Sequence, residues 1–329
     1  MNYDITRYRE KSITVREYMD KWLYLTKQPC LKPASFDRLE MLLKHQIYPS
    51  IGDKPISSVN SDDIQKAVND IAAAMSYSTA KKTYNYIGAC LRTAVLRGLI
   101  NQDPTQLVVM PKKNKVKEIS VYNTDEIKKI VETATATYKN GKYIYRYGYA
   151  VILMLNTGMR VGELLYLKWK DVDLDKRRIY IHGNVVCVKD RSSERKTSYK
   201  LLEQDTPKTS RSVRYIPLNE NAVNALEKLK AAIGSDTRVV AAKTGSIVSP
   251  RKIYHVMRKI LERSGVYGCC DVVHALRHTF ATALIRSGTD VKVVSEILGH
   301  SEVSTTFQIY YHTIEELKHN AVEHLDNIY

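Results

Sequence analysis

A short basic stretch, PKKNKVKEIS at residues 111–120, limits the fold of this chain more than any other feature. It begins with proline, holds few apolar side chains and is followed at Thr124 by the start of a new capped helix. The 329 residues exceed the usual size of one compact domain. We therefore predict two domains, residues 1–110 and 121–329, joined by a linker at 111–120. A simple surface loop is the alternative interpretation of the linker.

The first domain is predicted to consist of four helices, each with its own start or stop signal. The first follows the capping box Thr14-Val-Arg-Glu17. The second begins with Pro33 and reaches residue 47, and the third opens at Ser61 with two aspartates in its first turn. The fourth runs from about residue 78 and stops at Gly98.

The second domain mixes helices with a few strands. Two alternating apolar segments, RRIYIHGNVVCV and SVRYIPL, are typical of strands and are separated by a charged loop. Helical patterns are predicted at residues 124–136, 144–156, 219–232, 250–263, 275–287, 290–298, 303–311 and 314–325. The chain as a whole is therefore predicted to be mainly α, with a small antiparallel β-sheet in the second domain.

The charge of the chain favours a polyanionic partner. Its 51 Lys and Arg stand against 35 Asp and Glu, a formal net charge of +16. Such an excess repels itself unless a polyanion lies near. Nucleic acid is the commonest such partner and an anionic membrane surface the second. A solvated basic surface without a partner is the alternative.

The cysteines and the apolar segments point to the cytoplasm. The five cysteines form no C-x-x-C pair, which argues against a disulfide framework and against a cysteine-ligated zinc site. The first residues, MNYDITRYREKS, lack the apolar run of a secretory signal, and no stretch approaches the length that spans a bilayer. We expect a cytoplasmic protein with no membrane partner.

Four separated clusters hold the residues that could carry chemistry. They are NTGMRVGEL with Arg160 and Glu163, TPKTSRSVRYIPL with Lys208, HALRHTF with His274 and Arg277, and LGHSEVSTTFQIYYH with His300 and Tyr310. Their order and spacing resemble the tyrosine recombinase, or phage integrase, family, whose pattern is Arg, hairpin Lys, His-x-x-Arg, His and Tyr. The resemblance covers residue 120 to the end and, more loosely, the domain before it.

The two arginines of the pattern suit the chemistry of a phosphodiester. Cleavage requires that charge on the non-bridging oxygens be stabilised, and a planar guanidinium binds two such oxygens and stays protonated. Arg160 and Arg277 are predicted to take this role. Glu163 lies three residues after Arg160, so on a helix it shares a face with Arg160 and could orient its guanidinium. An ordinary surface charge is the alternative for each of the three.

The remaining roles are implied by the resemblance. Lys208 would be the general acid that protonates the leaving oxygen, although Lys189, Lys196 and Lys200 lie in the same region. His274 would be the acid/base near the tyrosine, and His300 would hydrogen-bond the scissile phosphate.

The resemblance implies that Tyr310 is the nucleophile, because the family's spacing T-T-x-x-x-Y-x-H fits Tyr310 and leaves Tyr311 in a variable position. Neighbouring residues of a helix point about a hundred degrees apart, so only one of the two tyrosines can face the site.

The resemblance also implies the partners. A helical core-binding domain and a catalytic domain would clamp duplex DNA at specific core sites, with Lys81, Lys82 and Arg92 as candidate phosphate contacts in the first domain. Family members act as tetramers on two DNA sites, through a 3′-phosphotyrosine and a Holliday junction, without metal, ATP or another cofactor. Directionality or DNA-bending proteins are candidate accessories. The amphipathic segment after Tyr310 would dock on a neighbouring protomer or on its own domain.

Three rival functions are considered. A type IB topoisomerase would share the chemistry but relax supercoils as a monomer, and a DNA-binding regulator would need none of the catalytic positions. His274 and His278 have the spacing of a zinc pair, but the metalloprotease pattern wants Glu after the first His, where Ala275 stands. His278 is therefore predicted to pack or to support its helix. Many integrases also carry an arm-binding domain before the core-binding domain, whereas this chain begins almost at the first core-binding helix.

Overall fold

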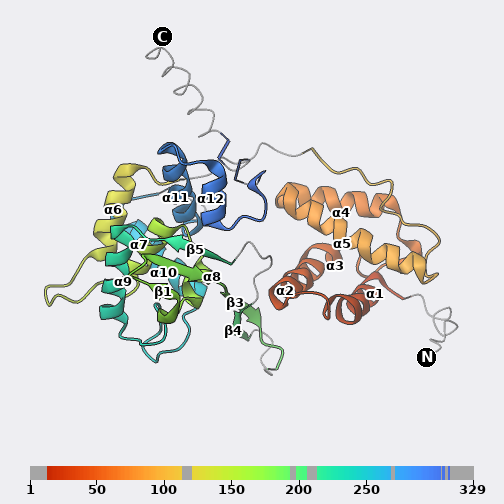
Figure 1. The fold of residues 1–329 in the computed structure, drawn as a ribbon. Helices are drawn as coiled ribbons and strands as arrows, with labels where there is room; N and C mark the ends of the chain where they lie inside the picture. Colours follow the sequence, from red (N-terminus) through yellow and green to blue (C-terminus); the bar gives the residue numbers. More distant parts are fainter. Residues whose placement is uncertain are drawn as a thin grey trace, which may run out of the picture. The chain divides into compact units, whose positions relative to one another are not determined.

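The computed structural model describes residues 13–112, 121–192, 198–205, 213–267, 271–304, 306–307 and 310–311. The chain divides into two compact units, Met1–Lys117 and Glu118–Tyr329 (Figure 1). Most of the predicted linker, residues 113–120, lies outside the described residues. So does the predicted helix at 314–325, and the proposed docking of that segment therefore stays a prediction.

The first unit is a set of helices around one apolar core. The helices are α1 (Val15–Trp22), α2 (Pro33–Leu42), α3 (Tyr48–Ile51), α4 (Ser61–Ala74) and α5 (Tyr77–Leu96). The core between them includes Trp22, Leu43, Ile64, Ile87 and Leu91, all nearly inaccessible to solvent. Burial of large apolar side chains from every helix is what holds such short helices together, because isolated helices of this length are marginal in water.

The helix starts of this unit follow the capping signals closely. Thr14 and Glu17 form the reciprocal capping box that the sequence predicts for α1. Ser61 is the first residue of α4, but the capping residue is Asn60, whose side chain accepts a hydrogen bond from the Asp63 amide. The ends of α1 and α2 continue as π-helical turns at Leu23–Lys27 and Leu43–Ile47.

The second unit surrounds helix α7 with the other helices (Figure 1). Its helices are α6 (Thr124–Thr135), α7 (Gly148–Thr157), α8 (Val161–Tyr166), α9 (Glu220–Ile233), α10 (Pro250–Ser264), α11 (His274–Arg286) and α12 (Val291–Leu298). In α7 the consecutive residues Ala150 to Met154 are all buried. A helix that is apolar on every side has to lie in the centre of its domain.

The strands of the second unit form two small antiparallel sheets. One has the order β1 (Val172–Asp173), β2 (Arg178–Ile181), β5 (Arg214–Pro217), with Ile179 opposite Ile216. The other is the hairpin of β3 (Asn184–Lys189) and β4 (Tyr199–Gln204). The predicted fold class, mainly α with small antiparallel β structure, is confirmed.

Three details differ from the sequence-based expectation. The sequence predicts a single sheet, whereas the described residues form two sheets. Strand β4 lies where the sequence predicts a charged loop. The helix expected at 144–156 begins only at Gly148, because Tyr143 forms a bridge with Thr137 in the preceding turn. The short helix α8 had no separate prediction. No helix in the described part of the chain is long and apolar enough to cross a membrane.

Candidate active site

The start of helix α8 places the first pair of predicted site residues. Arg160 is the residue before the helix, and its backbone amide donates to Glu163 Oε2 at 2.8 Å. The Arg160 guanidinium also donates to Glu163 through Nη1 to Oε1 at 2.9 Å. Glu163 thus fixes both the backbone and the side chain of Arg160. The Arg160 side chain keeps 40% of its surface accessible, so it is available to a ligand.

Glu163 is bound from the other side by Arg214, the first residue of strand β5. The Arg214 guanidinium forms a two-pronged ion pair, with Nη1 3.1 Å from Oε1 and Nη2 2.9 Å from Oε2. Its Nε donates to the Ile297 carbonyl at 2.6 Å. Burial alone would raise the pKa of Glu163, but the charges of Arg214, Arg160 and Arg277 outweigh it and lower this pKa to about 2. The carboxylate is therefore ionised throughout the physiological range.

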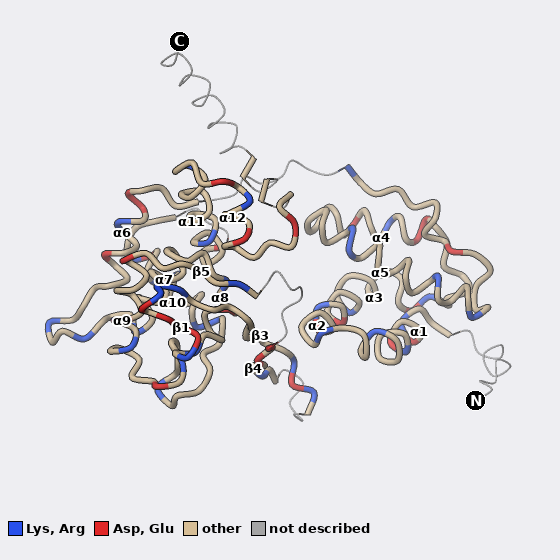
Figure 2. Tube along the Cα trace, viewed as in Figure 1, with Lys and Arg blue, Asp and Glu red and all other residues tan. Residues whose placement is uncertain are grey.

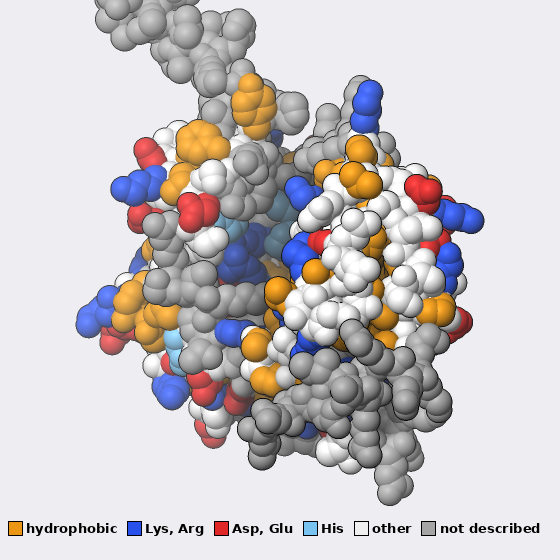
Figure 3. Space-filling view, turned by 90° about the vertical axis from the view of Figure 1, so that its right-hand side faces the viewer, with side chains coloured by type: hydrophobic (Ala, Val, Ile, Leu, Met, Phe, Trp, Pro, Cys, Tyr) orange, Lys and Arg blue, Asp and Glu red, His pale blue; other side chains and the backbone are white. Residues whose placement is uncertain are grey.

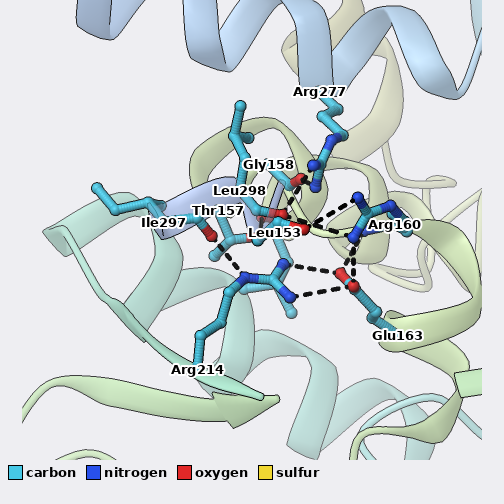
Figure 4. Close-up of polar contacts among 10 residues, drawn as sticks. Leu153, Thr157, Gly158, Arg160, Glu163, Arg214, Arg277, Ile297 and Leu298 are labelled. Atoms are coloured by element: carbon cyan, nitrogen blue, oxygen red, sulfur yellow. Dashed lines mark hydrogen bonds and ion pairs between the residues drawn. The ribbon is translucent and has the colours of Figure 1, made fainter. Parts of the chain in front are cut away.

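Arg277 is the third arginine of the network (Figure 4). It lies on α11 with 2% of its surface exposed, and it donates through Nη1 to the Gly158 carbonyl at 2.8 Å and through Nη2 to the Leu298 carbonyl at 2.7 Å. Burial, followed by the charge of Arg160, lowers the pKa of Arg277 to about 9, which leaves it protonated at neutral pH. The Arg160 guanidinium lies 3.5 Å from the same Leu298 carbonyl oxygen, so the two arginines meet there.

Two glycines shape the turns that supply these carbonyl groups. Gly158 ends α7 and Gly299 ends α12, and both adopt left-handed backbone angles, with φ of 62° and 67°. Gly158 also lies close to Phe280: a Cβ at this position would meet the ring at 2.4 Å. Glycine is thus required at the first turn for conformation and for space.

Tyr310, the predicted nucleophile, is hydrogen-bonded to a histidine. Its hydroxyl lies 2.9 Å from His278 Nδ1, and its side chain belongs to a small apolar cluster with Ala281, Ile285 and Leu298. Tyr310 is 3% exposed, whereas Tyr311 is 54% exposed. The pKa of Tyr310 is raised because the phenol is buried.

Burial lowers the pKa of each of the three histidines of the site. Burial, then neighbouring His274 and Arg277, lowers the pKa of His278 to about 4. Burial, then Arg277 and Arg160, lowers the pKa of His300 to about 3, and its Nδ1 lies 2.7 Å from the Thr306 hydroxyl. The pKa of His274 is lowered in the same way, chiefly by burial, and its ring contacts that of His278 edge to face at 4.6 Å.

The structure therefore brings together most of the residues that the sequence pattern singles out. All of the following lie in the second unit: Arg160 just before α8, Glu163 on α8, His274 and Arg277 on α11, and His300 and Tyr310 after α12. Lys208 lies outside the described residues, as does Lys196. Among the described lysines of that region, Lys200 forms an ion pair with Asp190. In the space-filling view, Lys, Arg and His side chains reach the surface of the molecule (Figure 3).

The candidate DNA contacts of the first unit lie on α5. Lys81 and Lys82 are exposed, and Arg92 is exposed but forms an ion pair with Asp103 at 3.5 Å. Basic residues also occur on other helices of this unit (Figure 2). Nothing in the geometry distinguishes these three from a solvated basic face, and they stay predictions.

Sequence reasoning missed two residues of the network. The sequence analysis does not select Arg214, although it is the last arginine of the segment TPKTSRSVRYIPL. The sequence analysis assigns His278 to packing or helix support. Only its position directly after Arg277 indicates that it could take part in the site. In the described part of the chain, no group of three or more His, Cys, Asp and Glu side chains is arranged to hold a metal ion.

Comparisons with known proteins identify similar chains over almost the full length. A family model described as the phage integrase family matches residues 121–316, and one described as the phage integrase central domain matches residues 15–109. A tyrosine recombinase XerC-like protein of Caldanaerobacter subterraneus subsp. tengcongensis is 32% identical, over 97% of this chain and 84% of its own length. The integrase of Staphylococcus phage L54a is 23% identical, over 97% of this chain and 94% of its own.

Solved structures share the fold. A Tn1549 transposon integrase in complex with a circular intermediate DNA matches with a TM-score of 0.75 at 19% identity, covering 94% of this chain and 99% of the other. A lambda integrase tetramer bound to a Holliday junction matches with a TM-score of 0.66 at 18% identity, covering 92% of this chain and 82% of the other.

Proposed function

Because this chain belongs to the phage integrase family, whose members are tyrosine recombinases that cleave and rejoin DNA, we propose that it is a site-specific recombinase acting through Tyr310. The phenol oxygen would attack a phosphodiester of duplex DNA, release a 5′ hydroxyl and leave a 3′-phosphotyrosyl bond. The 5′ hydroxyl released from a partner strand would then attack this phosphotyrosyl bond, which joins the two strands and releases the tyrosine. Exchange of strands in pairs would pass through a Holliday junction.

The observation that carries this proposal is the network of arginines around Glu163. Arg160, just before α8, and Arg277 of α11 converge on the Leu298 carbonyl, and Glu163 binds both Arg160 and Arg214. A guanidinium has five N–H donors, so the bonds to carbonyl groups leave others for phosphate oxygens. Donors that are already held in place stabilise the charge of the transition state without reorganisation at the moment of reaction. This is the central requirement for cleaving a phosphodiester.

The other groups would manage protons and orientation. Lys208 is proposed as the general acid for the leaving 5′ oxygen, and a neutral His300 would donate a hydrogen bond to the phosphate through the ring nitrogen that does not face Thr306. Phosphotyrosine conserves the energy of the broken bond. The reaction is therefore proposed to require neither metal nor ATP.

Partners are proposed from the same family. Similar integrases have been solved with DNA, and lambda integrase as a tetramer on a Holliday junction. We propose that this chain likewise assembles as a tetramer on two duplex sites, aided where needed by DNA-bending or directionality proteins. Residues 1–110 would form the core-binding domain, with Lys81, Lys82 and Arg92 on phosphates, and residues 121–329 the catalytic domain. The segment after Tyr310 would link neighbouring protomers.

The choice of nucleophile tests the proposed function directly. A pool of nicked duplexes of randomised sequence is incubated with the protein, and covalent complexes are isolated in denaturant. We expect Tyr310→Phe to bind the selected DNA and form no adduct, because the attacking oxygen is missing. The matched variant Tyr311→Phe removes an exposed hydroxyl and should form the adduct at the rate of the unsubstituted protein. Mass spectrometry that finds the nucleotide on Tyr311 or another tyrosine would contradict the assignment, and failure of the unsubstituted protein to form any adduct would contradict the function.

A further inference from the structure

The hydroxyl of Tyr310 has a specific partner that neither the sequence pattern nor the proposed chemistry assigns. His278 Nδ1 lies 2.9 Å from Tyr310 Oη, a normal distance for a hydrogen bond. The contact joins residues 32 positions apart. Resting on the proposed function, we propose that His278 holds the Tyr310 hydroxyl in place and accepts its proton when the tyrosine attacks DNA.

The surroundings fix both partners of this hydrogen bond. His278 lies within α11, and the buried Tyr310 side chain shares an apolar cluster with Ala281 and Ile285 of the same helix. The phenol oxygen is therefore held by packing on its ring and by one hydrogen bond at its tip. A reacting atom that is fixed in this way loses little freedom on reaching the transition state.

His278 is favoured over His274 by geometry. Among the described residues, the hydrogen bond of the Tyr310 hydroxyl is to His278, whereas the contact of the His274 ring is edge to face with His278. The backbone amide of His274 donates to Asp271 at the helix start. His274 thus lies one ring further from the tyrosine and would act on the nucleophile only through His278.

The charges around His278 make its nitrogen an acceptor. Burial, His274 and Arg277 lower its pKa to about 4, Asp271 acts in the opposite direction, and His300 is a further neighbour. A neutral imidazole with its proton on Nε2 presents a free lone pair at Nδ1. A phosphate bound by Arg160 and Arg277 would offset part of their positive charge and so raise the pKa of His278 in the DNA complex. The same anion that is to be attacked would therefore make His278 a better base.

The proton and the bonds balance in this step. The Tyr310 oxygen forms a bond to phosphorus as its O–H bond breaks, and the proton moves to His278 Nδ1, which makes that ring a cation. The bond from phosphorus to the 5′ oxygen breaks, and that oxygen takes a proton from the proposed acid, Lys208. The reverse reaction returns the proton from His278 to the phenol.

The test compares His278→Asn with variants of two other histidines. An asparagine oxygen can occupy the place of Nδ1 and accept a hydrogen bond, but it takes no proton at neutral pH. With the nicked duplexes selected by the unsubstituted protein, we expect adduct formation by His278→Asn to slow by about 10²- to 10⁴-fold, with DNA binding unchanged. His274→Asn should slow it less. His255→Asn, a change on the exposed face of α10, should leave the rate unchanged.

A pH profile separates proton transfer from a structural role. The unsubstituted protein should form adduct at a nearly constant rate between about pH 6 and pH 8, because a neutral His278 is present throughout. In His278→Asn the rate should rise about tenfold per pH unit, because only the ionised phenol then attacks. A variant that is slow at every pH with an unchanged profile would overturn the proposal.

A substrate with sulfur in place of the bridging 5′ oxygen identifies the side of the reaction on which His278 acts. A thiolate leaves without a proton, so this substrate removes only the need for an acid at the leaving group. It should therefore not restore the rate of His278→Asn. Full rescue would mean that His278 acts on the leaving group and would overturn the proposal. Thermal unfolding of His278→Asn and His278→Gln identifies a variant that remains folded for these measurements. A normal adduct rate in a folded His278 variant would refute the inference while leaving the proposed function intact.

Discussion

Glu163 is the residue on which the candidate site depends most for its structure. It is almost fully buried and accepts hydrogen bonds from the side chains of two arginines. Its pKa of about 2 in the folded protein lies below the usual glutamate pKa of 4.5. The ionised carboxylate therefore contributes stability that is fully present above about pH 4.5 and is lost as the pH falls toward 2.

Removal of this charge should destabilise the protein. We expect Glu163→Gln to lower the free energy of unfolding at pH 7 by about 3–5 kcal/mol, because buried guanidiniums then lack a counterion. The difference from the unsubstituted protein should shrink between pH 4.5 and pH 2. Thermal unfolding across this range is the measurement.

The control is an exposed ion pair of the same unit. Glu220 lies 2.7 Å from Arg177, with both side chains largely exposed. Glu220→Gln should change the free energy of unfolding by less than about 1 kcal/mol. Equal effects of the two substitutions would show that the Glu163 network contributes no more than a surface pair.

The sequence predicts the local part of this site better than its long-range part. Glu163 follows Arg160 by three residues, so helical geometry alone suggests their contact. Arg214 reaches Glu163 across 51 positions, and Tyr310 reaches His278 across 32. Such contacts depend on how helices and strands pack, which no local pattern encodes. The arrangement around Glu163 and the partner of Tyr310 therefore became visible only in the structure.

At the scale of secondary-structure elements, the turn after α7 connects the fold to the site. Gly158 ends the helix in a left-handed conformation, its carbonyl accepts from Arg277, and its Cα faces Phe280. We expect Gly158→Ala to lower the free energy of unfolding by about 2–4 kcal/mol, from backbone strain together with overpacking. Chemical denaturation measures this change.

Gly234 provides a matched comparison. It ends α9 with φ of 63°, nearly the angle of Gly158, but no atom lies within 4 Å of an added Cβ. Gly234→Ala should therefore lower the free energy of unfolding by about 1–2 kcal/mol, from backbone strain alone. If the two alanine variants are equally stable, the close approach of Phe280 does not restrict the turn.

Helices with explicit signals are the elements that the sequence predicts well. The capping box at Thr14 and the stop at Gly288 bound α1 and α11 as expected. Helix α8 has only six residues, too few for a periodic pattern to be recognised. Strand β4 is stabilised by pairing with β3, and its polar sequence YKLLEQ resembles a loop without that partner. At β4, pairing with another strand overrides local propensity.

At the scale of the whole molecule, the charge of +16 predicts strong salt dependence. If many Lys and Arg neutralise DNA phosphates, raising the salt from about 50 to 200 mM should weaken binding to a duplex by about 10³- to 10⁵-fold, because counterions are released on binding. Fluorescence anisotropy of a labelled duplex measures the slope. A flat dependence would mean that the positive charge serves another purpose.

Metal and nucleotide requirements also belong to the whole reaction. We expect adduct formation and strand exchange to proceed at an unchanged rate in EDTA with no ATP added, because the proposed arginines, histidines and lysine supply all charge and protons. The assay is the same nicked duplex with and without chelator. Activity that disappears in EDTA and returns with zinc or magnesium would refute this expectation.

The crowding of three guanidiniums around one carboxylate has an evolutionary consequence. Arg160, Arg214 and Arg277 bring more positive charge into the site than Glu163 neutralises, and two of them are almost fully buried. Unbalanced buried charge lowers the stability of the folded protein. Binding of an anionic substrate in the site should therefore raise that stability. Selection for stability alone would tend to replace Arg277 with an apolar side chain. Its retention would then record selection for activity, and laboratory evolution toward heat resistance should be run with an activity screen at every round.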